Sequence, residues 1–102
     1  MGKVSVIATL RVKDGKGDGF PAAFDEFFRH VEGEDGTEHY VLHRSTTDPN
    51  LFFMTELYAD KAAFEAHSGS DAFAALAGGL GDYVDSFDLQ MAEPVKAVGV
   101  KL

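Results

Sequence analysis

Residues 36–73 read GTEHYVLHRSTTDPNLFFMTELYADKAAFEAHSGSDAF, and this stretch decides the fold. Two strand-like runs, His39–Ser45 and Leu51–Tyr58, flank the turn-forming segment Thr47–Asn50. Asp, Pro and Asn favour turns, because Pro restricts φ and the Asp and Asn side chains bond to nearby backbone. The stretch therefore predicts a β-hairpin.

The second run of this hairpin is apolar on both faces. Three large residues share one face of the strand: Phe52, Met54 and Tyr58. The other face carries Leu51, Phe53 and Leu57. A strand of this kind is covered on both sides. A short chain has helices for only one face of a sheet, so we predict that the other face packs on a second copy in a homodimer.

Upstream of the hairpin, the sequence predicts a strand and then a helix. Val4–Val12 alternates between apolar and polar residues, as a half-buried strand does. The glycine-rich segment Asp14–Gly19 interrupts the pattern, and Pro21 suits the first turn of a helix. Five apolar residues then recur at helical spacing and predict a helix over residues 20–32: Phe20, Phe24, Phe27, Phe28 and Val31.

Downstream of the hairpin, helical sequence comes in two segments. Asp60 and Ser70 are both favourable N-cap residues, and Gly69 lies between the segments. The first contains Phe64 and His67, and the second has an apolar stripe: Phe73, Leu76, Leu80 and Tyr83. We therefore predict a helix that is broken near Gly69.

The last part of the chain completes the predicted topology. Alternation over residues 87–92 predicts a final strand, and Val95–Leu102 predicts a short additional edge strand. The order βαββαβ is that of an α+β, ferredoxin-like fold. A chain of 102 residues suits a single domain, which we expect to span residues 1–102.

Composition excludes several classes of function. A net charge of −8 argues against nucleic acid or an anionic membrane as partner, because both require a basic surface. The chain has no Cys, which excludes thiolate catalysis and Cys-ligated metals. The first twenty residues contain no apolar signal segment, so we expect a cytoplasmic protein.

The landmarks in residues 36–73 resemble those of the antibiotic biosynthesis monooxygenase family. They comprise Gly36, Tyr40, Leu42, Arg44, Asp48-Pro49-Asn50, Phe52, Glu56, Tyr58, Asp60, His67, Ser70 and Phe73. The resemblance implies a dimeric α+β barrel. It also implies a monooxygenase that oxidises a small quinol or hydroxylated aromatic with molecular oxygen and uses no metal, flavin or haem.

Two residues are candidates for acid–base catalysis. His67 occupies a family landmark, and imidazole changes its charge near neutral pH, which suits a general base. Glu56 shares a strand face with Met54 and Tyr58, so burial of that face would perturb its carboxylate. We expect His67 to act as the base and Glu56 to orient or replace it. His39 and His43 lie four residues apart in a strand, too far apart to bind one metal, and we predict no metal site.

The expected substrate cavity lies between the helices and the sheet. Tyr58 would donate to the substrate oxygen, Met54 would lie beside it, and aromatic walls would come from Phe24, Phe28, Phe64 and Phe73. The polar anchors that related enzymes use for aromatic polyketides are replaced here by Met54, Tyr58 and Phe64. Two alternatives therefore stay open: a non-catalytic dimeric barrel that binds an apolar metabolite, and a proton-transfer enzyme of the lactone isomerase type.

Overall fold

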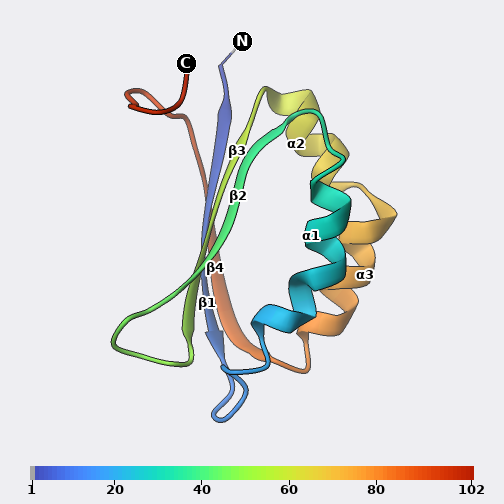
Figure 1. The fold of residues 1–102 in the computed structure, drawn as a ribbon, viewed down its shortest axis with the longest axis vertical. Helices are drawn as coiled ribbons and strands as arrows, with labels where there is room; N and C mark the ends of the chain where they lie inside the picture. The colour runs from blue at the N-terminus through green and yellow to red at the C-terminus, as the bar shows by residue number, and fades with distance from the viewer. Residues whose placement is uncertain (1) are drawn as a thin grey trace.

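One antiparallel sheet of four strands forms one layer of the protein, and the helices form the other (Figure 1). The computed structural model describes residues 2–102. The strands, in the sheet order β2-β3-β1-β4, are β2 Thr37–Arg44, β3 Leu51–Tyr58, β1 Val4–Val12 and β4 Val84–Ala92. The helices are η1 Pro21–Phe24, α1 Asp25–Val31, α2 Lys61–Ser68 and α3 Asp71–Leu80. This architecture confirms the predicted ferredoxin-like α+β fold.

Two local predictions need correction. The helix expected over residues 20–32 begins as the 3₁₀ turn η1 and becomes α-helical only at Asp25. The edge strand predicted over Val95–Leu102 is wrong, because these residues form no strand. Pro94 has no amide hydrogen for strand pairing, and Val98 is fully exposed. The alternation of apolar residues in this tail therefore reflects no buried face.

Helix caps form where the sequence predicted them. The Asp60 side chain accepts a hydrogen bond from the Ala63 backbone amide at 2.8 Å, and Ser70 accepts one from Phe73 at 3.0 Å. Each cap satisfies a backbone amide that has no partner within its own helix. The chain therefore turns between α2 and α3 at Gly69, which is the predicted break.

Strand register places one row of side chains under the helices. Glu56 of β3 lies directly opposite Val6 of β1 on one side and Tyr40 of β2 on the other. Residues two positions along β3, Met54 and Tyr58, share this face and are almost fully buried. The helix-covered face is therefore an apolar layer that contains one carboxylate.

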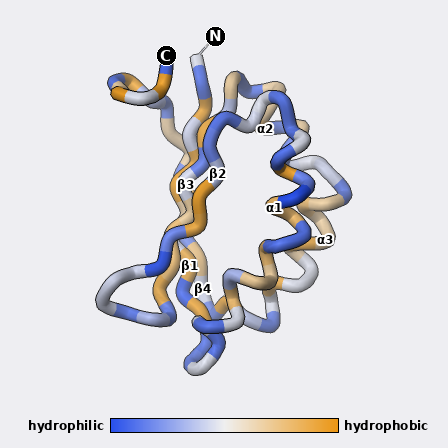
Figure 2. The backbone as a smooth tube through the Cα atoms, in the orientation of Figure 1, coloured by the Kyte–Doolittle hydropathy of each residue, from blue (hydrophilic) through white to orange (hydrophobic). Residues whose placement is uncertain are grey.

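The core lies between this face and the helices. Aromatic rings from η1, α1 and the sheet meet edge to face, as Phe20 does with Phe24 and with Phe52. Figure 2 shows the apolar residues along the middle of the sheet and the polar residues in the loops at its ends. No helix within residues 2–102 is both long and apolar enough to cross a membrane.

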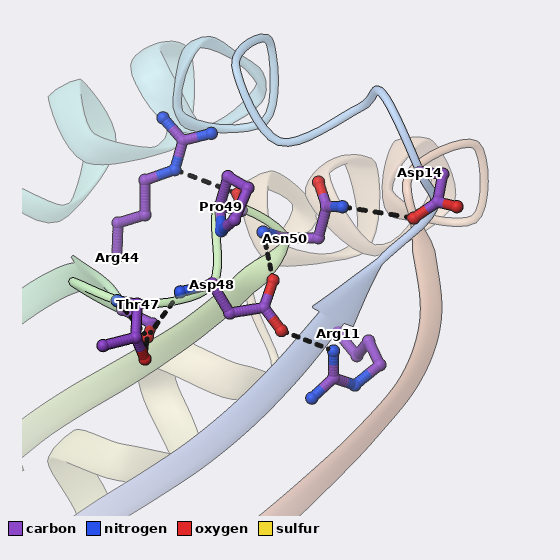
Figure 3. Close-up of polar contacts among 8 residues, drawn as sticks. Arg11, Asp14, Arg44, Thr47, Asp48, Pro49 and Asn50 are labelled. Carbon is purple, nitrogen blue, oxygen red and sulfur yellow. Dashed lines mark hydrogen bonds and ion pairs between the residues drawn. The ribbon is translucent and has the colours of Figure 1, made fainter.

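The turn between β2 and β3 is held by polar contacts (Figure 3). The Asp48 carboxylate accepts hydrogen bonds from the Asn50 backbone amide and from Arg11 of β1, both at 2.9 Å. The Asn50 amide and then the Arg11 guanidinium lower the pKa of Asp48. The side chain of Asn50 also reaches Asp14, so the turn is tied to the loop that follows β1.

Candidate functional site

The Glu56 carboxylate lies in the lining of a mainly apolar cavity between α3 and the sheet, and Asp85 of β4 is the other acidic residue in that lining. The cavity has a volume of about 540 Å³. Its walls are mainly apolar and come from β1, η1, α3 and β4: Ala8, Leu10, Phe24, Phe73, Leu76, Ala77, Leu80, Val84, Phe87 and Leu89. The β4 wall is open to solvent, since Phe87 is 69% exposed. A small aromatic molecule can enter along β4 and reach Glu56.

Glu56 is largely buried, and its carboxylate accepts a hydrogen bond. Its side chain is 10% exposed, and the Tyr58 hydroxyl donates a short hydrogen bond to its Oε1. Burial raises the pKa of Glu56 above its ordinary value, although the Tyr58 hydrogen bond opposes this effect. A carboxylate with a raised pKa is a stronger base once ionised, which suits it to proton abstraction.

His67 lies behind Glu56 and not in the cavity wall. It is near the end of α2 and is only 2% exposed. Four aromatic rings surround it with centroids 5.0 to 5.8 Å away: Phe27, Tyr40, Tyr58 and Phe73. Its Nε2 is 4.0 Å from Glu56 Oε1. The structure thus brings the two predicted catalytic residues together, with Glu56 as the one that meets the cavity.

Glu34 is a site residue that sequence reasoning missed. It follows α1, and its Oε1 lies 2.8 Å from Nδ1 of His67 and accepts a hydrogen bond from Thr37. Burial alone would raise the pKa of Glu34, but the hydrogen bonds from His67 and Thr37 hold it below its ordinary value. The acidic segment around Glu34 looks like a solvated turn, and only the nearby landmark Gly36 signals close packing.

Gly36 explains how Glu34 reaches the interior. A Cβ at this position would lie 2.3 Å from the Cβ of Ala63, so only glycine lets the turn approach α2 this closely. The Gly36 carbonyl also accepts a hydrogen bond from the Ala59 backbone amide at 2.8 Å. These contacts hold the turn against the end of β3 and place Glu34 beside His67.

Tyr40 is a second residue that sequence reasoning missed. It lines the cavity from β2, directly opposite Glu56 in the sheet. Burial, and then the carboxylates of Glu56 and Glu34, raise the pKa of Tyr40 far above its ordinary value. Its hydroxyl therefore keeps its proton and can donate to an oxygen atom in the cavity. Strand alternation alone would have placed Tyr40 on this face.

The predicted substrate-binding residues fall into two groups. Met54, Phe24 and Phe73 line the same cavity as Glu56. Tyr58 lies beneath the cavity wall, where it donates to Glu56 and packs against Phe64 at a ring distance of 5.4 Å. Phe28 lines a separate surface pocket beside η1 and β2. Helical and strand periodicity identified buried aromatics, but it did not say which of them border a void.

The remaining histidines are on the surface. His39 and His43 extend from β2 on the face away from the helices, and each places Nε2 within 3.2 Å of the Thr55 hydroxyl. Their rings thus converge on one atom, although their backbones are far apart. Within residues 2–102, no group of three or more His, Cys, Asp or Glu side chains is arranged to hold a metal ion.

Comparison with known proteins identifies the family and supports the fold. The family model described as antibiotic biosynthesis monooxygenase matches residues 3–78. A structure from Caulobacter crescentus, named as a candidate antibiotic biosynthesis monooxygenase, is 30% identical, with a TM-score of 0.86 and coverage of 93% of this chain and 92% of that one. None of the curated proteins matches the sequence.

More distant structures share the fold. A candidate antibiotic biosynthesis monooxygenase from Nitrosomonas europaea is 19% identical, covers 97% of each chain and has a TM-score of 0.86. A conserved protein of unknown function from Bacteroides thetaiotaomicron, described as a possible oxidoreductase, is 20% identical with a TM-score of 0.81. Coverage is 90% of this chain and 97% of that protein.

Proposed function

Because the chain belongs to the antibiotic biosynthesis monooxygenase family, we propose that it oxidises a small quinol or hydroxylated aromatic with molecular oxygen. The observation that carries this proposal is the largely buried Glu56 carboxylate in the lining of a mainly apolar cavity. In this proposal, protein side chains and the substrate itself supply the chemistry, with no cofactor.

The first step is proton abstraction. Glu56 takes a proton from an activated position of the substrate, either a phenolic O–H or a C–H whose anion the aromatic system delocalises. The resulting anion is electron rich and transfers an electron to oxygen, and the radical pair combines to form a C–O bond. The peroxide takes up a proton and loses water, so that a CH₂ group and O₂ become C=O and H₂O.

The rest of the cavity supports this step. Tyr40 keeps its hydroxyl proton, so it can donate a hydrogen bond to the substrate oxygen as negative charge develops there. A bound aromatic substrate would displace water from these apolar walls, and water would otherwise quench the anion. Phe24 and Phe73 offer ring faces and edges against which a flat aromatic molecule can pack. Tyr40 thereby takes the donor role that the sequence had suggested for Tyr58.

Oxygen consumption with a panel of quinols and anthrones tests the proposal. We expect uptake of one O₂ per substrate and incorporation of one ¹⁸O atom from ¹⁸O₂ into the product. Glu56→Gln should abolish most of this uptake. Glu65→Gln, an exposed carboxylate on α2, is the matched control and should leave it unchanged.

Other outcomes would replace the proposal with one of its alternatives. Substrate isomerisation without oxygen uptake, lost in Glu56→Gln, would identify a proton-transfer enzyme that uses the same base. Tight binding of an aromatic ligand in the cavity, with no conversion of that ligand in the presence or absence of oxygen, would identify a binding protein. Each result contradicts monooxygenase activity in a different and measurable way.

A homodimer is the second part of this proposal. The sheet face away from the helices carries Phe53 and the exposed Ile7, and no helix within residues 2–102 packs on it (Figure 1). Burial of such a face against a second copy would remove apolar area from water and stabilise the pair. Sedimentation at micromolar concentration should therefore give about twice the 11.0 kDa mass of one chain.

A further inference from the structure

Four titratable side chains form a continuous line from the cavity to the protein surface. They are Glu56 on β3, His67 on α2, Glu34 after α1 and His30 on α1. Three separate segments of the chain supply them, so local sequence does not account for their alignment. The monooxygenase step proposed above requires only the first of the four.

The distances along this line suit proton transfer. Glu34 lies in the middle and contacts both histidines: its Oε1 is 2.8 Å from Nδ1 of His67, and its Oε2 is 3.2 Å from Nε2 of His30. The remaining gap, 4.0 Å from Nε2 of His67 to Oε1 of Glu56, becomes a hydrogen bond when it shortens by about 1 Å. Both ring nitrogens of His67 therefore face a carboxylate.

Exposure rises toward one end of the line. The side chains of Glu56 and His67 are 10% and 2% exposed, that of Glu34 is 15% exposed, and that of His30 is 40% exposed. His30 also lines a groove between α1 and α3, and the ring of Phe27 contacts the rings of both His30 and His67. The line thus runs from the apolar cavity to His30, the most exposed of the four side chains.

We propose that Glu56, His67, Glu34 and His30 form a path that exchanges protons between the cavity and solvent. This inference rests on the proposed function for the origin of the proton. In it, Glu34 has two roles: by accepting from Nδ1 of His67 it holds the unprotonated Nε2 toward Glu56, and it also carries the proton onward to His30. His67 is then a relay and not the base that meets the substrate.

Proton balance along the path is simple. The proton that Glu56 takes from the substrate passes to Nε2 of His67, and the Nδ1 proton passes to Glu34. Glu34 then hands a proton to His30, which releases one to water. The overall conversion of CH₂ and O₂ to C=O and H₂O neither releases nor consumes protons. Protonation of the peroxide therefore draws a proton back along the same path, from His30 toward Glu56. This return restores the His67 tautomer with its proton on Nδ1.

Three further polar side chains lie close to the inner part of this path: Tyr40, Tyr58 and Thr37. Tyr40 on β2 and Tyr58 on β3 face His67, but their hydroxyls keep their protons because burial and the nearby carboxylates raise both pKa values. Thr37 donates to Glu34 and does not ionise in this range. In this proposal, the transferred proton therefore passes through the two carboxylates and the two histidines.

The tautomer of His67 gives a test that does not need a substrate. Nitrogen-15 NMR of the wild-type protein should show a protonated Nδ1 and an unprotonated Nε2 at neutral to slightly alkaline pH. In Glu34→Gln this assignment should be lost or mixed, because the amide can donate as well as accept. Glu32→Gln, an exposed neighbour, should leave the spectrum unchanged. A wild-type His67 with its proton on Nε2 would overturn the proposal.

Buffer dependence of turnover tests the outer half of the path. His30→Ala should lower kcat about tenfold in dilute buffer with KM unchanged, and added imidazole buffer should restore it. Wild-type turnover should not depend on buffer concentration. Equal rates for His30→Ala and wild type in dilute buffer, or a loss that imidazole does not rescue, would overturn the path. If no substrate is oxidised at all, the proposed function fails, and the NMR result still decides whether the relay is assembled.

Discussion

The two faces of the sheet carry similar residue types but use them differently. On the helix-covered face, His67 is 2% exposed and lies between the carboxylates of Glu34 and Glu56. On the open face, His39 and His43 are exposed and share the hydroxyl of Thr55. Thr55 and Glu56 are adjacent in sequence, yet they belong to opposite environments.

The difference shows that burial, more than residue type, produces the unusual chemistry. Desolvation raises the pKa of Glu56 and of Tyr40 on the covered face. A hydrogen bond inside the aromatic layer also costs more to lose, because water cannot replace the missing partner. We therefore expect substitutions on the covered face to have the larger effects.

The largest expected effect is on catalysis. Glu56→Gln keeps the shape of the side chain but removes the base, so kcat should fall by about 10²- to 10⁴-fold. Thr55→Val, its neighbour on the other face, should leave kcat within twofold of wild type. Oxygen uptake on both purified variants gives the comparison, with circular dichroism to check folding. Equal losses in both variants would mean that the two faces do not differ in function.

The open face is tested next through association. Phe53→Asp should convert the expected dimer to monomers, since an unpaired charge would be buried between two copies. Sedimentation at several concentrations measures this change. Leu57→Asp is a useful contrast: Leu57 is already 6% exposed within one chain, so this change should unfold the protein and not merely split the dimer. A Phe53→Asp protein that stays dimeric would place the interface elsewhere.

Packing of the covered side is tested by glycine substitutions. Gly36→Ala should lower the free energy of unfolding by about 1–3 kcal/mol, because the new methyl group would overlap with Ala63. Gly78→Ala is the control, since nothing lies within 4 Å of its added methyl group and alanine favours the helix. Urea denaturation should therefore show opposite signs for the two variants. A neutral Gly36→Ala would mean that the turn can move away from α2.

The two carboxylates beside His67 should give opposite pH dependence. The pKa of Glu56 is raised, so its contribution to stability is lost as pH rises from the ordinary Glu pKa of about 4.3 through the higher native value. The pKa of Glu34 is lowered, so its contribution is lost as pH falls from about 4.3 through the native value. The melting temperature of each variant should therefore be measured between pH 3 and 8. Glu56→Gln should lose the fall in melting temperature toward higher pH, and Glu34→Gln should lose the fall toward lower pH. The same slope change in both variants would contradict these assignments.

The smallest expected effect is on the exposed hydrogen bonds of the open face. Thr55→Val removes the hydroxyl that His39 and His43 share, and the free energy of unfolding should change by no more than about 0.5 kcal/mol. Water can solvate both imidazoles after the change. A loss above 1 kcal/mol would show that the second copy buries this cluster, and it would strengthen the case for the dimer.

Local sequence was sufficient for most of the fold. Alternation over Val4–Val12 and the strand-like apolar run Leu51–Tyr58 predicted β1 and β3 with their observed bounds. Asp60 and Ser70 marked the starts of α2 and α3, because a cap bonds only to amides two or three residues away. The prediction of an edge strand over Val95–Leu102 was wrong because local alternation forms a strand only where a partner strand accepts its hydrogen bonds.

The site depended on contacts that no local pattern encodes. Sequence identified Glu56 and His67 as a pair, and it placed Met54, Phe24 and Phe73 on the correct faces. Tertiary packing decided that Glu56 meets the cavity while His67 lies behind it. It also brought in Glu34, 33 positions away from His67, and set Tyr40 opposite Glu56. Periodicity determines which way a side chain points, but voids and ion pairs arise only where separate elements meet.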